Sequence, residues 1–125
     1  MGTILVTGAA GFIGSHVSEM LLKRGERVVG YDNLDPYYDP RFKKRNLNQL
    51  ADHLNFTFIE ADIREADKLI RVIKNQEVDR IIHLAALAGV RTSINRAADY
   101  TAVNIGGTVN VLEAARAVSA RNTVI

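Results

Sequence analysis

Short, almost wholly apolar runs alternate along this chain with longer segments in which apolar residues recur at helical spacing. The runs are rich in Val and Ile and mostly lack polar alternation, as expected for strands covered on both faces of a sheet. They predict strands at residues 3–7, 27–31, 55–61, 79–85 and 122–125. The segments between them predict helices at residues 11–24, 41–53, 64–75 and 97–119, of which the second is the weakest.

The alternation of strands and helices implies parallel strands joined by right-handed crossovers. We therefore predict an α/β fold, a doubly wound parallel sheet of the Rossmann type, with about five strands in the order 3-2-1-4-5 and helices on both faces. Residues 1–125 form one domain in this prediction, because no repeat, linker or low-complexity tract divides them. Ligands of such sheets bind beyond the carboxyl ends of strands 1 and 4, where the strand order reverses.

Composition narrows the class of protein. The hydrophobic fraction of 47% and the charged fraction of 24% are ordinary for a globular domain, and a net charge of +2 does not argue for nucleic acid. The absence of cysteine excludes disulfides and thiolate metal sites and fits a reducing compartment. Because no apolar stretch approaches the roughly 18 residues that a membrane helix needs, we expect a cytoplasmic domain with no membrane partner.

A glycine-rich stretch, VTGAAGFIGSH at residues 6–16, follows the first predicted strand and opens the first predicted helix. A helix start offers unpaired N–H groups and a positive dipole end, which favour an anion. In this interpretation Gly8 permits the tight turn, Gly11 lets a pyrophosphate approach the backbone, and Gly14 lets the helix pack closely. The spacing is one residue longer than the common dinucleotide pattern, and glycines that serve helix packing alone are the alternative. A P-loop is excluded, because no lysine follows the glycines.

An acidic residue at the end of the second predicted strand supports a dinucleotide. Asp32 follows Gly14 by 18 residues, where a carboxylate accepts hydrogen bonds from the adenosine ribose and repels a 2′-phosphate. A simple turn residue is the alternative. The cofactor is therefore predicted to be NAD, while a basic run at residues 41–45 keeps NADP open if its side chains fold back over the ribose.

Five stretches in order, VTGAAGFIGSH, YDNLDPYY, EADIRE, HLAALAGVRTSI and YTAVNIGGTVNVLEAAR, resemble the extended short-chain dehydrogenase/reductases. More narrowly, they resemble nucleotide-sugar 4-epimerases that act on UDP-glucose or UDP-glucuronate. The resemblance runs from Thr3 to Ile125 and corresponds to the N-terminal part of such enzymes. It therefore implies a truncated Rossmann domain without the C-terminal lobe that holds the sugar.

The resemblance also implies a cofactor site. Pyrophosphate would lie on the glycine stretch, ribose at the end of the second strand, adenine at the end of the third, and the rest of the dinucleotide along the loop after the fourth. The implied residues are Gly8, Gly11, Phe12, Ile13 and Gly14 for pyrophosphate; Asp32, Asn33 and Leu34 for ribose; Asp62 and Ile63 for adenine; Leu84, Ala85, Ala86 and Ala88 after the fourth strand; and Asn104 behind the nicotinamide side.

Several positions have a plainer structural alternative. Asp62 also fits an N-cap of the third helix, and residues 84–86 also fit ordinary core packing. Asn104 is predicted to have a buried amide that braces the loop after the fourth strand, with a capping or solvent-bridged Asn as the alternative. His83 is expected to be a packed strand residue rather than a ligand, because no metal-binding cluster accompanies it. Arg91 resembles a substrate-facing arginine for a UDP-sugar, or is a solvated loop residue.

Chemistry in the resembled family depends on a Tyr-x-x-x-Lys pair beyond the fifth strand, whose tyrosine takes a proton from the sugar while hydride moves to NAD. No tyrosine in this chain has a lysine four residues later; the four are Tyr31, Tyr37, Tyr38 and Tyr100. Tyr37 and Arg41 come closest to the Tyr-x-x-x-Lys pattern, but an arginine side chain always keeps its positive charge. No catalytic residue is predicted.

Three functions follow from these observations. The first is a dinucleotide-binding module that is not catalytic alone, the second is part of an enzyme completed by another chain, and the third is a folded remnant without ligand. Truncation would also expose the edge of the fifth strand and apolar surface. We therefore expect self-association, most simply a two-fold dimer through that edge or the long helix.

Overall fold

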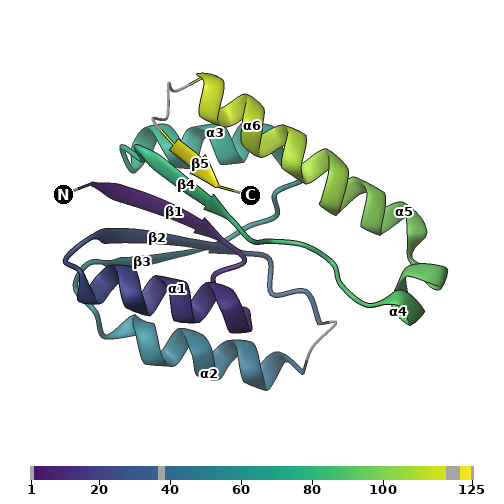
Figure 1. The fold of residues 1–125 in the computed structure, drawn as a ribbon, viewed down its shortest axis with the longest axis horizontal. Coiled ribbons are helices and arrows are strands. Elements are labelled where there is room, and N and C mark those ends of the chain that lie inside the picture. Colours follow the sequence, from purple (N-terminus) through teal and green to yellow (C-terminus); the bar gives the residue numbers. More distant parts are fainter. Residues whose placement is uncertain (1, 37–38, 118–121, 125) are drawn as a thin grey trace.

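The computed structural model describes residues 2–36, 39–117 and 122–124, which form one parallel sheet with helices on both faces (Figure 1). The strands are β1 (Thr3–Thr7), β2 (Arg27–Asp32), β3 (Phe56–Glu60), β4 (Arg80–His83) and β5 (Asn122–Val124). Their order in the sheet is β3-β2-β1-β4-β5, so the predicted doubly wound topology is confirmed. Ile125, the last residue of the predicted fifth strand, lies outside the described residues.

Helices cover both faces of the sheet. On one face lie α1 (Phe12–Lys23) and α2 (Pro40–Ala51), and on the other lie α3 (Ala66–Asn75) and α6 (Thr108–Ala117) (Figure 1). These elements fall where the periodicity predicts them. None of the helices in the described part of the chain is long and apolar enough to cross a membrane.

The predicted long helix is divided in the structure. It consists of α5 (Ala97–Tyr100), a π-helical segment η1 (Thr101–Gly107) and α6, while residues 118–119 of the prediction lie outside the described residues. A further short helix, α4 (Val90–Asn95), has no buried residue. Sequence periodicity therefore gives no sign of α4, because a helix that buries nothing needs no apolar stripe.

The core explains why the strand at residues 3–7 lacks polar alternation. All five positions of β1 are buried, because helices cover both faces of the sheet. Alternate side chains point to opposite faces, so Leu5 and Val29 pack in the cluster that includes α3 and α6. Ile4, Val6 and Val28 pack in the cluster that includes α1 and α2.

The parallel strands bring several loops to a single edge of the sheet. Because β1 to β4 all run in the same direction, the residues that follow their carboxyl ends meet there. This edge is where the order reverses between β1 and β4, the place at which doubly wound sheets bind ligands.

Candidate functional site

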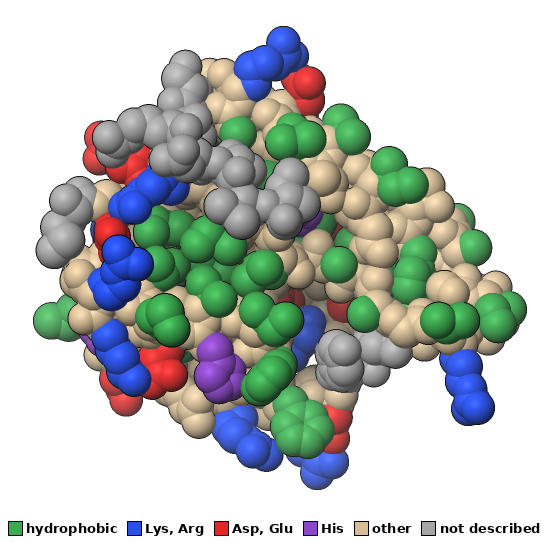
Figure 2. Space-filling view, in the orientation of Figure 1, with side chains coloured by type: hydrophobic (Ala, Val, Ile, Leu, Met, Phe, Trp, Pro, Cys, Tyr) green, Lys and Arg blue, Asp and Glu red, His purple; other side chains and the backbone are tan. Residues whose placement is uncertain are grey.

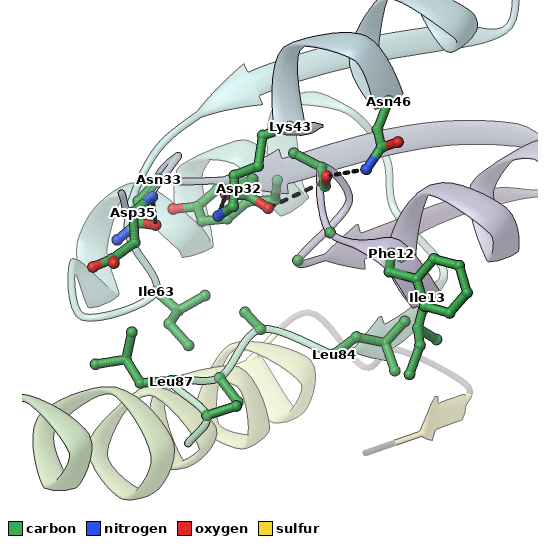
Figure 3. Close-up of a pocket in the computed structure, with 18 of the residues that line it drawn as sticks. Phe12, Ile13, Asp32, Asn33, Asp35, Lys43, Asn46, Ile63, Leu84 and Leu87 are labelled. Atoms are coloured by element: carbon green, nitrogen blue, oxygen red, sulfur yellow. Dashed lines mark hydrogen bonds and ion pairs between the residues drawn. The ribbon is translucent and has the colours of Figure 1, made fainter. Parts of the chain in front are cut away.

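A cavity of about 770 Å³ opens at this edge, and its walls come from the loops after β1, β2, β3 and β4 and from α2 (Figure 3). It brings together every sequence-predicted cofactor residue except Leu34 and Asn104. The predicted residues that line it are Gly8, Gly11, Phe12, Ile13, Gly14, Asp32, Asn33, Asp62, Ile63, Leu84, Ala85, Ala86 and Ala88.

The glycine turn, residues 8–14, is built by close backbone packing. Gly8 has a left-handed φ of 72°, and its N–H donates to the carbonyl of Tyr31 at 2.8 Å. A Cβ on Gly8 would lie 2.9 Å from the backbone nitrogen of Ala85, and one on Gly14 would collide with the carbonyl of Gly8. Both positions therefore require glycine.

Gly11 has a different role. Its φ of −75° suits any residue, and a Cβ there would meet only the carbonyl of Gly8, at 3.3 Å. Gly11 is the N-cap of α1, and no side-chain hydrogen bond caps the helix. Because Gly11 lines the cavity, a larger side chain there would occupy space that the start of α1 offers to an anion.

Asp32 is a buried carboxylate, 6% exposed, at the end of β2. Its Oδ2 accepts the N–H of Ala10 at 3.1 Å, and its Oδ1 accepts the N–H of Leu34 at 2.7 Å. The ammonium of Lys43 lies 3.1 Å from Oδ1. Since each oxygen offers about two acceptor positions, Oδ2 keeps one for a further donor.

Leu34 stays a predicted ribose residue. It does not line the cavity, and it lies in the left-handed region with a φ of 57°. Its N–H holds Oδ1 of Asp32, so its main chain shapes the turn that presents the carboxylate.

Asp62, in the loop after β3, is held by two neighbours. Arg64 approaches both carboxylate oxygens, at 3.0 and 2.7 Å, and Asn33 donates to Oδ2 at 3.0 Å. Chiefly because of the hydrogen bond from the Arg64 side chain, the pKa of Asp62 is lowered to about 2. The N-cap of α3 is Glu65, so the alternative role of Asp62 as that N-cap is wrong.

The loop after β4 is fixed through a buried histidine. His83 Nδ1 lies 2.6 Å from the hydroxyl of Thr7, and Nε2 lies 3.1 Å from the hydroxyl of Thr108. Thr7 Oγ1 also accepts the N–H groups of the next two residues after His83, at 3.0 and 3.1 Å. Burial lowers the pKa of His83, which is the packed strand residue that the sequence predicts.

Asn104 braces the same loop from η1. Its Nδ2 donates to the carbonyl of Leu87 at 2.9 Å, and its Oδ1 accepts the N–H of Leu87 at 2.8 Å. The predicted bracing role is confirmed, although Asn104 does not itself line the cavity. Tyr100 adds a second brace, because its hydroxyl donates to the carbonyl of Ala88 at 2.6 Å.

Sequence reasoning did not place several cavity residues in the site. Lys43 and Asn46 reach it from α2, where Asn46 donates to the carbonyl of Ala10 at 2.9 Å and so ties α2 to the glycine turn. Lys43 belongs to the basic run at residues 41–45, whose side chains are expected at the ribose if they fold back, whereas the spacing of three residues from Lys43 is the one sequence sign for Asn46. The other cavity residues that were not predicted are Ala10, Tyr31, Asp35, Phe42, Arg45, Ala61, Leu87 and Val103.

The described residues contain no proton-transfer pair of the tyrosine–lysine type. Burial raises the pKa of Tyr31 to about 12, and the Tyr100 hydroxyl is committed to a carbonyl. Tyr37 and Tyr38 lie outside the described residues. Arg91 is exposed on α4 and is not among the cavity residues. Within the described ranges, no three His, Cys, Asp or Glu residues are grouped as a metal ion needs.

The glycine turn entering α1, the buried carboxylate ending β2 and the cavity between them define a nucleotide-binding domain of the Rossmann class. The chain belongs to the family described as GDP-mannose 4,6 dehydratase, whose pattern matches residues 5–125.

Curated relatives are similar over nearly the whole chain. A UDP-glucuronate 4-epimerase of Thermodesulfobacterium geofontis is 46% identical over 113 residues, which cover 90% of this chain and 35% of the relative. UDP-glucuronate 4-epimerase 4 of Arabidopsis thaliana is 39% identical over 123 residues, covering 98% of this chain and 28% of the relative. The chain thus spans about a third of these relatives or less.

Solved structures give the same result. A UDP-glucose 4-epimerase of Stenotrophomonas maltophila, with bound NAD and formylated UDP-arabinopyranose, matches with a TM-score of 0.84 and 29% identity, over 98% of this chain and 36% of that one. A Thermus thermophilus UDP-glucose 4-epimerase in complex with NAD matches with a TM-score of 0.81 and 32% identity, over 97% of this chain and 36% of that one. The resemblance to the N-terminal part of nucleotide-sugar epimerases is confirmed.

Proposed function

We propose that this chain binds NAD in the cavity and does not catalyse sugar epimerisation by itself. One observation carries the proposal: the glycine turn and the buried Asp32 face one cavity that has room for a dinucleotide. The NAD bound in several similar epimerase structures supports it.

The dinucleotide is proposed to follow the wall of the cavity. Its pyrophosphate meets the N–H groups at the start of α1, which Gly11 leaves accessible, and its adenosine ribose donates to the free acceptor position on Asp32. Adenine lies against the loop that holds Asp62 and Ile63. The rest of the dinucleotide passes the small side chains of residues 84–88. When bound, NAD would supply hydride acceptance, while these residues hold and orient it.

NAD is preferred over NADP because the oxygens of Asp32 stand where a ribose 2′-phosphate would have to lie. Of the basic run, Lys43 does fold back to Asp32, with a side chain only 12% exposed. Arg41 pairs with Asp39 instead, at 2.6 Å. The single ammonium offsets part of the carboxylate's charge, so discrimination against NADP is proposed to be moderate.

An active epimerase would need a catalytic pair and a sugar-binding lobe from residues outside this chain. The relatives are about three times as long as the match, and the Tyr-x-x-x-Lys pair does not occur in this chain. The alternative function is therefore one part of a UDP-sugar 4-epimerase, completed by another chain. Arg91, exposed on α4, would then be free to meet the carboxylate or phosphate of the sugar nucleotide.

Self-association is a further proposal. Figure 2 shows apolar side chains gathered on the face of the molecule that is viewed in Figure 1. On α1, Ile13 and Met20 are 62% and 64% exposed. On the long helix, Ile105, Val109 and Leu112 are 63%, 50% and 48% exposed at helical spacing. Sedimentation should detect a dimer at tens of micromolar, and a monomer at that concentration counts against it. A cytoplasmic location stays a prediction.

Calorimetric titration with NAD, followed by an epimerase assay with UDP-glucose and UDP-glucuronate, tests the proposal. Saturable one-site binding without turnover is expected. Turnover by the chain alone would show that it needs no further residues, and the absence of binding would favour a folded domain without ligand.

A further inference from the structure

We propose that Arg96 is a positioning residue for the adenosine half of the dinucleotide. It acts through a closed ring of ion pairs and hydrogen bonds that joins three separate segments at the rim of the cavity. This inference rests on the proposed binding of NAD. The ring residues are Asn33, Asp35, Asp62, Arg64, Arg96 and Asp99.

Arg96 stands at the junction of α4 and α5 and makes contacts in two directions. Its two terminal nitrogens reach the two oxygens of Asp35, in the loop after β2, at 3.4 and 3.1 Å. Its Nε donates to Asp99 at 3.1 Å. Asp99 in turn lies 3.7 Å from Arg64, which follows β3. A planar guanidinium suits this two-sided role, because its donors form a rigid fork.

The ring closes through the cavity wall. Arg64 holds Asp62 with a contact of 2.7 Å, and Asp62 accepts Nδ2 of Asn33 at 3.0 Å. Oδ1 of Asn33 accepts the N–H of Asp35, also at 3.0 Å. The Asp35 carboxylate pairs with Arg96, and this contact closes the ring. Each of the six residues therefore contacts two others.

Half of the ring faces the proposed ligand. Asn33, Asp35 and Asp62 line the cavity, whereas Arg96 and Asp99 do not. Figure 3 places Asn33 and Asp35 beside Asp32 and across from Ile63, at the end of the cavity assigned to ribose and adenine. Arg96 can therefore affect adenosine only through the carboxylates that it holds.

Charge gives the ring its importance for an anionic ligand. It contains three carboxylates and two guanidiniums, and the Asp35 side chain is only 14% exposed. Removing the Arg96 cation leaves excess negative charge on the wall at the adenosine end, which faces an anionic ligand, and it releases the loop after β2 from α5. Both effects weaken adenosine binding.

The opposite end of the cavity has its own supports. The loop after β4 is braced chiefly by Asn104 of η1, which is not a ring residue. Tyr100, the second brace, belongs to α5, and its N–H donates to the main-chain carbonyl of Arg96, a bond that a change of the Arg96 side chain keeps. Loss of Arg96 should therefore weaken a ligand that carries adenosine and leave the nicotinamide half alone. A merely structural role would weaken both halves together.

The test compares Arg96→Gln with the wild-type chain of residues 1–125. Calorimetry with NAD and with ADP-ribose should show about tenfold weaker binding of both, or about 1.4 kcal/mol. Ligand-observed NMR with nicotinamide mononucleotide should show no change. Arg96→Lys, which keeps the charge but loses the fork, should recover part of the affinity. Arg116→Gln is the matched control, because Arg116 pairs only with Glu113 among the described contacts and its side chain is 79% exposed.

Two results would overturn the inference. Unchanged NAD affinity in Arg96→Gln, or equal weakening of both half-ligands, would do so while leaving the proposed function intact. Failure of the wild-type chain to bind either NAD or ADP-ribose would overturn both proposals. If Arg96→Gln does not fold, Asp99→Asn opens the same ring at a half-buried position and is expected to weaken ADP-ribose more than nicotinamide mononucleotide.

Discussion

Two loops on opposite sides of the same cavity are built in different ways. The glycine turn after β1 depends on close backbone packing, with Gly8 at a φ of 72° and no space for a side chain at Gly14. The loop after β4 is held instead by side chains from other elements, above all Asn104 of η1. A local sequence motif can specify the first kind of loop, whereas the second depends on residues distant in the sequence.

The largest effect is expected from adding a methyl group to the glycine turn. Gly14→Ala would place a Cβ against the carbonyl of Gly8, and relief of that collision requires α1 to move. We expect a loss of about 3 kcal/mol in the free energy of unfolding, and loss of NAD binding, measured by urea denaturation and calorimetry. Gly106→Ala is the control, since its Cβ would come no closer than 4.0 Å to its nearest neighbour, the carbonyl of Thr101. Equal effects of the two changes would contradict the account.

A smaller effect is expected at the side-chain-held loop. Asn104→Ala leaves the N–H and carbonyl of Leu87 without their present partner, at a cost of about 2 kcal/mol in unfolding free energy. Hydrogen exchange should quicken at residues 84–89 while the glycine turn keeps its protection. Asn48→Ala, at an exposed position of α2, is the matched control. Protection that stays unchanged after Asn104→Ala would show that the loop needs no brace.

A change of cofactor preference is expected at Lys43. Lys43→Met removes the ammonium beside Asp32 and leaves the carboxylate less neutralised. The NADP:NAD ratio of dissociation constants should rise by about tenfold, which corresponds to about 1.4 kcal/mol. Lys44→Met, one residue away and exposed, should leave the ratio unchanged. A fall in the ratio after Lys43→Met would mean that the lysine favours NAD over NADP.

The smallest effect is a pH dependence of stability. Because burial lowers the pKa of His83, the unfolded chain binds a proton at this residue more readily than the folded chain. Stability from this residue is complete above the unfolded pKa of about 6.5 and falls as pH drops from there toward the folded pKa. Urea midpoints at pH 7.5 and 5.5 should show the decrease, and His83→Gln should reduce it. A midpoint that rises on acidification in wild type alone would contradict the assignment.

The division between the two loops also explains what the sequence could predict. Uniform apolar runs, helical spacing and the glycines specify the strands, the main helices and the turn, because each depends on neighbouring residues. Asp32 could be assigned from its distance to the glycines, since the distance reflects one strand–helix–strand unit.

The other features of the site depend on contacts between distant residues, which no local sequence pattern predicts. Asn46 belongs to a mostly polar helix, so its position at the cavity has little sequence signature, and Lys43 could be expected there only as one member of the basic run at residues 41–45. Leu34 follows two residues that line the cavity, yet it does not line the cavity itself, and no sequence pattern marks its left-handed backbone. Arg96 meets Asp35 across 61 residues. Asp35 lies in the stretch YDNLDPYY, but Arg96 belongs to none of the five stretches that carry the resemblance, so their contact could not be predicted.

The central claim is tested most directly at Gly11, whose backbone angles suit any residue and which lines the cavity at the start of α1. Calorimetric NAD titration of Gly11→Val should give affinity at least about 100-fold weaker than wild type, or about 2.7 kcal/mol. The melting temperature should stay within a few degrees of wild type. Wild-type affinity in a folded Gly11→Val chain would contradict the claim that the diphosphate lies on this turn.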